Sequence, residues 1–152
     1  MKDPRQLPSQ LLVALQFGLM GAQAWLALPA LLPWTIAPAA WAAAVLALLL
    51  AAWAISANRP GNFNIRPIPK AGGALVTHGP YRWIRHPMYT AVLLGAFALA
   101  RAADSGLAWV TWAALLLVLW FKSTLEERWL LAQHPGYAHY RDQSKRFVPW
   151  VY

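Results

Sequence analysis

The sequence predicts an all-α integral membrane protein, a helical bundle of about four transmembrane helices. Of its 152 residues, 59% are hydrophobic and only 12% are charged, whereas a soluble domain carries about 25% charged residues. The sequence also contains four apolar runs with few or no charged residues. A chain of this length forms one domain, so we expect residues 1–152 to fold as a single membrane-embedded unit.

The first two apolar runs are long enough to cross a bilayer as helices. Residues 10–32 carry no charge, and residues 36–56 form a second uncharged run rich in Ala and Leu. About 20 apolar residues suffice for one helical crossing, and the short proline-containing link predicts a tight turn. The first run is too long for the apolar core of a signal peptide and lacks a small-residue cleavage site, so we expect it to remain as a helix.

The third and fourth runs are shorter and predict a second helical hairpin. They cover residues 87–103 and 106–122, and the turn-forming sequence Asp-Ser-Gly lies between them. Arg101 interrupts the third run, but a long basic side chain near a helix end can reach the membrane interface. We therefore expect both runs to cross the membrane, with a re-entrant hairpin as the alternative.

The basic residues predict the orientation of the bundle. Four crossings place both termini on one side, which then holds twelve of the thirteen Lys and Arg residues, all except Arg101. The positive-inside rule puts that side, with the loop 57–86 and the tail 123–152, in the cytoplasm. The net charge of +8 then reflects topology and contact with anionic lipid rather than nucleic acid. The short chain with Ala- and Leu-rich spans favours a bacterial inner membrane.

Polar residues that can bind a ligand gather in the two cytoplasmic segments. Arg85 precedes the pair His86-Pro87, which stands where a helix can begin, and a helix start attracts an anion. Glu126 and Glu127 offer the opposite charge, so a ligand with both an ammonium and a carboxylate would bridge the two segments. The chain has no cysteine and no zinc-binding histidine spacing, so we expect no metal site.

Two local alternatives stay open. Arg82 and Arg85 are three residues apart and would share a face of one helical turn, where they could bind a ligand. The alternative is that they only fix the topology and pair with the two glutamates. Ser123, followed three residues later by Glu126, has the spacing of a capping box that starts a new helix. The same stretch is also compatible with a continuation of the fourth span past the interface.

The order of the motifs resembles a known family. The run GPYRWIRHPMY, the apolar hairpin after it, then EERWLL and YAHYRDQSKRFVP resemble the isoprenylcysteine carboxyl methyltransferase and phospholipid methyltransferase superfamily, over about residues 75–149. Its members are membrane-embedded enzymes that use S-adenosylmethionine. Where the family has Phe-Gly before its two tyrosines, this chain has His134-Pro135 and one residue fewer, but Tyr137 and Tyr140 keep their mutual spacing.

The resemblance implies a cofactor pocket on the cytoplasmic face, closed by the loop before the third span and by the C-terminal tail. The residues implied to line it are His78, Gly79, Tyr81, Arg85, His86, Pro87, Tyr89, Glu126, Glu127, Tyr140 and Arg146. Arg85 and Glu127 are the catalytic candidates. At the reacting end, Arg85 would orient an acceptor carboxylate or phosphate, and Glu127 would accept a proton from an amine.

We therefore expect methyl transfer from S-adenosylmethionine to a lipophilic acceptor that enters from the bilayer. The acceptor classes are an isoprenylcysteine-like carboxylate, a lipid amine or a small thiol; no residue selects among them, and the oligomeric state is open. One alternative is an NADPH-dependent membrane sterol reductase, which shares a similar C-terminal architecture but is normally much longer. The other is a non-catalytic helical module whose basic face contacts membrane lipid or a partner.

Overall fold

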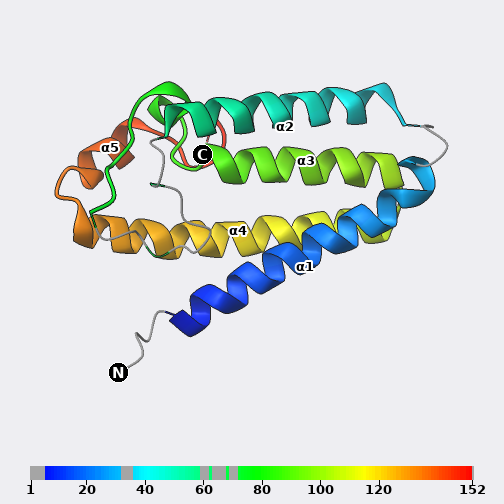
Figure 1. Ribbon diagram of the computed structural model, residues 1–152, viewed down its shortest axis with the longest axis horizontal. Coiled ribbons are helices and arrows are strands. Elements are labelled where there is room, and N and C mark those ends of the chain that lie inside the picture. Colours follow the sequence, from blue (N-terminus) through cyan, green and yellow to red (C-terminus); the bar gives the residue numbers. More distant parts are fainter. Residues whose placement is uncertain (1–5, 32–35, 59–61, 63–67, 69–71, 152) are drawn as a thin grey trace.

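The computed structural model describes residues 6–31, 36–58, 62, 68 and 72–151. These residues form α-helices and one short 3-10 helix, with no β-strand among them (Figure 1). The elements are α1 (Gln6–Leu31), α2 (Pro38–Ala57), η1 (Gly79–Arg82), α3 (Pro87–Ala103), α4 (Gly106–Gln133) and α5 (Tyr137–Gln143). The predicted all-α class is confirmed.

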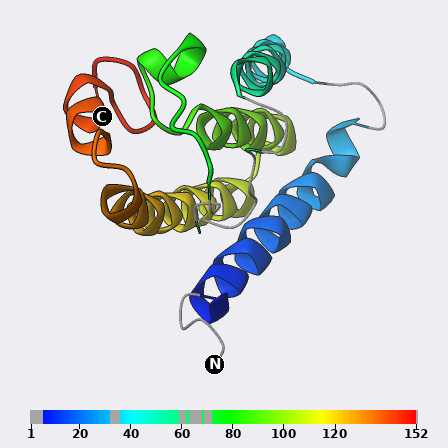
Figure 2. The ribbon, with the colours of Figure 1, turned by 60° about the vertical axis from the view of Figure 1, so that its left-hand side comes forward.

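The four long helices pack into one bundle. Helix α2 packs on α3, and α1 crosses both α3 and α4 at an angle (Figures 1 and 2). A small core lies between α3 and α4, built from Leu93, Ala96, Leu115 and Leu119, and Met20 of α1 packs against it. Within the described ranges, α1, α2 and α4 are long and apolar enough to cross a membrane, and α3 is a shorter apolar helix.

The bundle has an apolar exterior and several polar groups inside. Large hydrophobic side chains such as Trp25, Leu48 and Val110 are more than half exposed, whereas Gln23 and Lys122 are buried. Polar residues of membrane helices face the bundle interior, and apolar ones face lipid. This distribution agrees with a helical membrane bundle.

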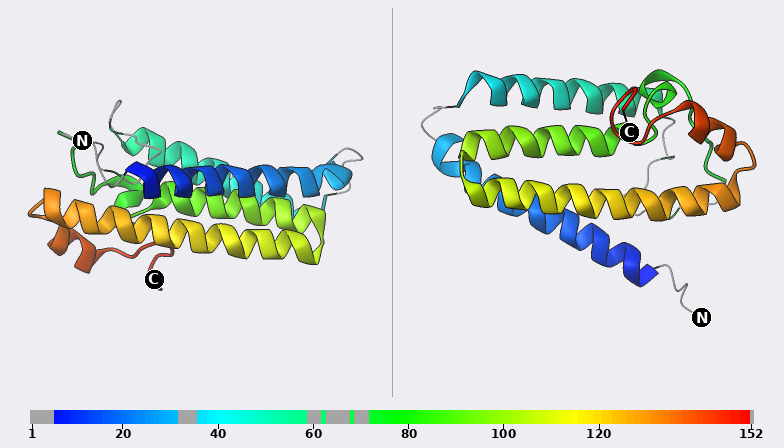
Figure 3. Two further views of the ribbon diagram at one scale, coloured as in Figure 1. Left: turned by 90° about the horizontal axis from the view of Figure 1, so that it is seen from below. Right: turned by 180° about the vertical axis from the view of Figure 1, so that it is seen from behind.

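Basic residues gather at one end of the bundle. Those described, apart from Arg101, belong to η1, the segment before α3, the second half of α4, α5 and residues 144–151, here called the C-terminal segment. Figures 1 and 3 show these elements together where α4 ends, away from the α3–α4 turn. The remaining basic residues lie outside the described residues: Lys2, Arg5, Arg59, Arg66 and Lys70.

The helix boundaries follow local sequence signals. Helix α3 begins at Pro87, where a proline costs no hydrogen bond, and its bounds equal those of the predicted third span. Its end is set by Asp104, which adopts a left-handed conformation (φ 45°) and pairs with Arg101 at 2.9 Å. Ser105 then caps α4 by accepting a hydrogen bond from the Ala108 N–H at 3.2 Å.

Helix α4 extends beyond the predicted fourth span, which ended at residue 122. It continues to Gln133, so the first part of the predicted tail is helical. The capping-box interpretation of Ser123 is wrong, because Ser123 lies inside α4 and its hydroxyl donates to the Trp120 carbonyl at 2.8 Å. The extension carries both glutamates away from the apolar core toward the C-terminal segment.

Gly79 fixes the position of η1 against α2. Its φ is +60°, a conformation that favours glycine, and a Cβ at this position would lie 2.7 Å from the Ala57 Cβ. No other residue fits here without moving η1 from the end of α2. Gly79 therefore has a packing role that anchors the segment leading to α3.

We expect Gly79→Ala to destabilise the protein by about 1–3 kcal/mol, because it adds left-handed strain and a clash with Ala57. Thermal unfolding in detergent measures the loss. The matched control is Gly136→Ala, since Gly136 has a φ of −80° and open space around its Cα. Equal losses in the two variants would contradict the steric account.

Candidate functional site

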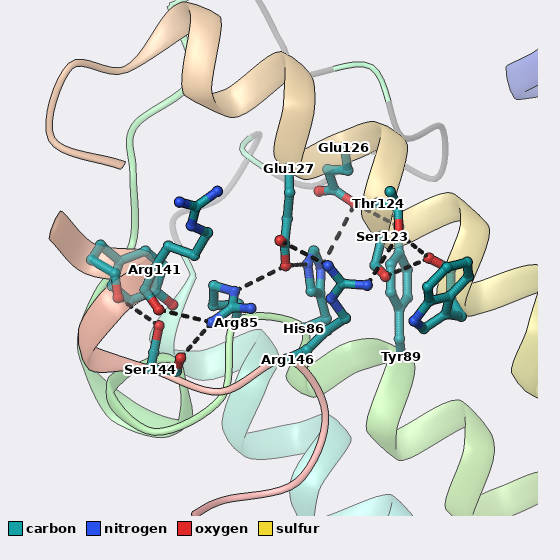
Figure 4. A network of polar contacts seen from close by, with 12 residues as sticks. Arg85, His86, Tyr89, Ser123, Thr124, Glu126, Glu127, Arg141, Ser144 and Arg146 are labelled. Atoms are coloured by element: carbon teal, nitrogen blue, oxygen red, sulfur yellow. Dashed lines mark hydrogen bonds and ion pairs between the residues drawn. The ribbon is translucent and has the colours of Figure 1, made fainter. Parts of the chain in front are cut away.

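The site is organised around Glu127, a buried carboxylate of α4. Its Oε1 accepts a hydrogen bond from Arg85 Nε at 2.9 Å and lies 3.0 Å from His86 Nε2, while Arg146 Nη2 lies 3.2 Å from Oε2 (Figure 4). Hydrogen bonds between ionised partners are stronger than neutral ones. One carboxylate thus joins α4 to the segment before α3 and to the C-terminal segment.

Backbone hydrogen bonds reinforce this junction. The Arg85 N–H donates to the Lys145 carbonyl at 2.7 Å, and the Lys145 N–H donates to the Trp83 carbonyl at 2.9 Å, which forms a short parallel bridge. The Arg85 guanidinium also donates to the carbonyls of Arg141 and Ser144. Arg85 is therefore held by both its backbone and its side chain.

Glu126 points away from this junction. Its Oε2 accepts a hydrogen bond from the Tyr89 hydroxyl at 2.7 Å and lies 3.9 Å from His86 Nδ1. The His86 ring stacks on the Tyr89 ring with centroids 5.2 Å apart and planes 2° from parallel. His86 thus contacts both glutamates, one through each ring nitrogen.

A cavity of about 130 Å³ opens beside Glu126. It is here called the main cavity, although a hollow of about 380 Å³ also borders Arg85, beside Arg141 and Lys145. The described residues that line the main cavity are Asn62, Ile68, Gly73, Ala74, Leu75, Val76, Tyr81, Arg85, His86, Glu126, Leu130, His134, Tyr137 and Tyr140. A smaller hollow of about 100 Å³ lies at the start of α3. It shares Tyr81, Arg85, His86 and Glu126 with the main cavity and adds Pro87, Met88 and Tyr89. Both spaces combine a carboxylate, a guanidinium and aromatic rings.

Tyr137 lines the main cavity, and its hydroxyl is buried. The residue is 1% exposed, and its hydroxyl has no hydrogen-bond partner in the described part of the chain. Because buried polar atoms are nearly always paired, this hydroxyl is an exception within the described part of the chain. Sequence reasoning did not name Tyr137 as a site residue, although its spacing to Tyr140 was noted.

The tyrosines of the main cavity remain neutral hydrogen-bond donors. Burial and the Glu126 carboxylate raise the pKa of Tyr81 to about 12. Burial also raises the pKa values of Tyr137 and Tyr140 well above their usual range. The Tyr140 hydroxyl donates to the Tyr81 carbonyl at 2.7 Å, whereas the Tyr137 hydroxyl has no hydrogen-bond partner among the described residues.

The structure brings most of the predicted site residues together. Those lining the main cavity or the smaller hollow are Tyr81, Arg85, His86, Pro87, Tyr89, Glu126 and Tyr140. Glu127 and Arg146 are not among the residues that line these two spaces, and they pair with each other in the junction with the C-terminal segment (Figure 4). His78 is exposed and Gly79 packs on α2, so neither is among the residues that line the two spaces.

Arg82 and Arg85 do not share a face, and that expectation is wrong. Arg82 ends η1 and is exposed, with its guanidinium 6.0 Å from the centre of the Trp83 ring. The 3-10 helix ends at Arg82, and the chain then turns and bridges at Ile84 to Lys145. Arg85 thus turns inward to Glu127 while Arg82 stays at the surface.

We expect Glu127→Gln to release the C-terminal segment, because the variant leaves Arg85 and Arg146 without their counter-charge. Breaking a buried ion pair on one side costs about 3–5 kcal/mol. Hydrogen–deuterium exchange of the Arg85, His86 and Lys145 amides should therefore accelerate strongly.

Glu126→Gln is the matched control for this measurement. Glu126 contacts Tyr89 and His86 rather than the C-terminal segment, so the same amides should stay protected. Equal exchange in the two variants would show that Glu127 does not hold the junction.

Comparison with known proteins agrees with the motif order. The family model of phospholipid methyltransferases matches residues 34–135. The cobalt-zinc-cadmium resistance protein CzcN of Cupriavidus metallidurans is 34% identical to the chain over 82 residues, which cover 53% of this chain and 38% of the relative. The match thus spans well under half of that protein's length. No solved structure matches the chain significantly.

Proposed function

The chain belongs to the phospholipid methyltransferase family, and we propose that it transfers a methyl group from S-adenosylmethionine to a lipophilic acceptor. The observation that carries this proposal is the main cavity, where an unpaired Tyr137 hydroxyl accompanies Glu126 and Arg85. The cavity offers both signs of charge and a free donor beside an apolar bundle.

The donor set of the site fits the charges of S-adenosylmethionine. Its amino-acid end has an ammonium and a carboxylate, and its sulfur is positively charged. The Glu126 carboxylate suits the positive groups, and the Arg85 guanidinium suits the carboxylate. The Tyr137 hydroxyl would donate to a further polar atom of the cofactor. When bound, S-adenosylmethionine would supply an activated methyl group: an acceptor atom would bond to the methyl carbon in line with the breaking S–C bond, and the sulfur would leave as the neutral thioether of S-adenosylhomocysteine.

The residues of the chain mainly position the reactants and exclude water, which is what such a displacement requires. We propose that Glu126 contacts the cofactor and that Glu127 is a positioning residue, because three donors already surround the Glu127 carboxylate. Arg85 lines both spaces and stays the candidate for orienting an acceptor. Proton transfer to Glu127 from an amine remains a prediction.

We propose that the acceptor reaches the site from the bilayer, since the smaller hollow lies at the start of α3, next to the apolar bundle. The grouping of basic residues at this end supports a cytoplasmic location for the site and for both termini. A bacterial inner membrane remains the favoured location, on the composition of the helices.

Glu126→Gln should weaken S-adenosylmethionine binding by roughly tenfold to a hundredfold, because a hydrogen bond to a charged group is worth about 1.5–3 kcal/mol. Isothermal titration calorimetry on protein purified in detergent measures this. Arg82→Gln, at the exposed end of η1, serves as control and should bind as the wild type does. No binding at millimolar cofactor to folded wild-type protein would overturn the proposal and favour a non-catalytic module.

Tyr137→Phe should separate ligand binding from stability. Removing an unpaired buried hydroxyl should leave the ligand-free protein equally stable or stabilise it by about 1 kcal/mol, while cofactor affinity falls. Tyr140→Phe removes a hydroxyl that has a partner, so it should instead lower stability by about 1 kcal/mol. Thermal unfolding with and without cofactor measures both effects, and a destabilised Tyr137→Phe would argue against a free hydroxyl.

A further inference from the structure

A line of polar side chains runs along α1 inside the apolar bundle. Ser9, Gln16 and Gln23 recur every seven residues, so they share one face of the helix, and all three are buried. Gln23 Nε2 donates to the Ala108 carbonyl of α4 at 3.0 Å, and Gln16 Oε1 accepts a hydrogen bond from Lys122 Nζ at 2.6 Å. Gln16 and Gln23 therefore face α4.

Lys122 is the charged member of this contact. It is 1% exposed, and besides Gln16 its ammonium contacts the Tyr89 ring, 5.1 Å from the centroid. No carboxylate of the described residues lies within ion-pair distance of it. Glu126, one helical turn further along α4, accepts instead from the Tyr89 hydroxyl.

An ammonium has three N–H donors, and a buried charge is normally paired. Lys122 uses one donor on Gln16 and so keeps hydrogen-bonding capacity for a group that is not part of the described chain. An ionisable residue inside a membrane bundle marks a functional site by default. The group that best complements a buried ammonium is an anion.

Tyr89 connects Lys122 to the candidate site. The same ring that lies against the Lys122 ammonium stacks on His86, and its hydroxyl binds Glu126. Tyr89 and Glu126 also line the smaller hollow. Lys122 therefore lies one aromatic ring away from the space next to the proposed cofactor site, on the side of the apolar bundle.

We propose that Lys122 and Gln16 bind the anionic head group, a carboxylate or a phosphate, of a lipophilic acceptor. In the ligand-free protein Gln16 holds the ammonium in place, and an acceptor oxygen would take up its remaining donors. The buried cation also discriminates against an acceptor whose only charge is a protonated amine. The interpretation of this anion site as an acceptor site rests on the proposed methyl transfer, but the binding of an anion to Lys122 does not.

The test uses brominated amphiphiles, which quench tryptophan fluorescence on contact. Wild-type protein in a neutral detergent is titrated with 9,10-dibromostearate, with the corresponding dibromooctadecyl phosphate, and with the uncharged dibromostearate methyl ester. At least one anionic probe should bind roughly tenfold more tightly than the ester, as expected for a hydrogen bond to a charged group. The two anionic probes show whether a carboxylate or a phosphate is preferred.

Lys122→Met should abolish this preference for the anionic probe, while Lys122→Arg should retain part of it. Should the methionine variant fail to fold, Lys122→Gln provides the neutral substitution in a polar form. Arg101→Gln is the matched control, because Arg101 pairs with Asp104 at the opposite end of α3 and should not affect the preference. A neutral variant that binds the anionic probe as the wild type does would overturn the proposal.

Titration of S-adenosylmethionine in the same samples separates this proposal from the proposed function. A wild-type protein that prefers the anionic probe but binds no cofactor would keep the head-group site and overturn methyl transfer. A wild-type protein that binds the cofactor but binds anionic and uncharged probes equally well would support methyl transfer and overturn the head-group site. Cofactor binding should survive in Lys122→Met, which would place Lys122 on the acceptor side.

Discussion

The carboxylate of Glu127 is the interaction on which the geometry of the site depends. Its partners Arg85 and His86 lie 42 and 41 residues away in the sequence, and Arg146 lies 19 residues away. Without this anion two guanidinium groups would be packed together with no counter-charge, at a cost of several kcal/mol. The backbone pairing around Lys145 and the position of the cavity walls follow from this ion cluster.

The side chains of Glu126 and Glu127 lie in two different environments although the residues are adjacent, because they project from different faces of α4. Successive residues of an α-helix are rotated by about 100°, so Glu127 faces the C-terminal segment while Glu126 faces the cavity. Lys122 lies one turn before Glu126 on α4, where the helix is still inside the bundle. A single helix thus presents a buried cation, an anion that lines the main cavity and an anion that joins three segments in succession.

Composition and charge were sufficient to predict the helical bundle, and Pro87 marked the start of α3 correctly. The end of α4 could not be placed because hydropathy falls at Lys122, whereas helical hydrogen bonding continues to Gln133. Most of the residues named from the order of the motifs lie close together in the structure. The unpaired hydroxyl of Tyr137 and the pairing of Lys122 with Gln16 depend on contacts between distant segments, which local patterns do not encode.

The position of His86 between the two glutamates has a thermodynamic consequence. One ring nitrogen faces Glu127 and the other faces Glu126, so a single imidazole lies between the two carboxylates. If a ligand at Glu126 displaces this imidazole, its binding and the docking of the C-terminal segment are linked equilibria, and linkage is reciprocal. If docking of the segment raises the ligand affinity by some factor, the bound ligand raises the docking equilibrium constant by the same factor.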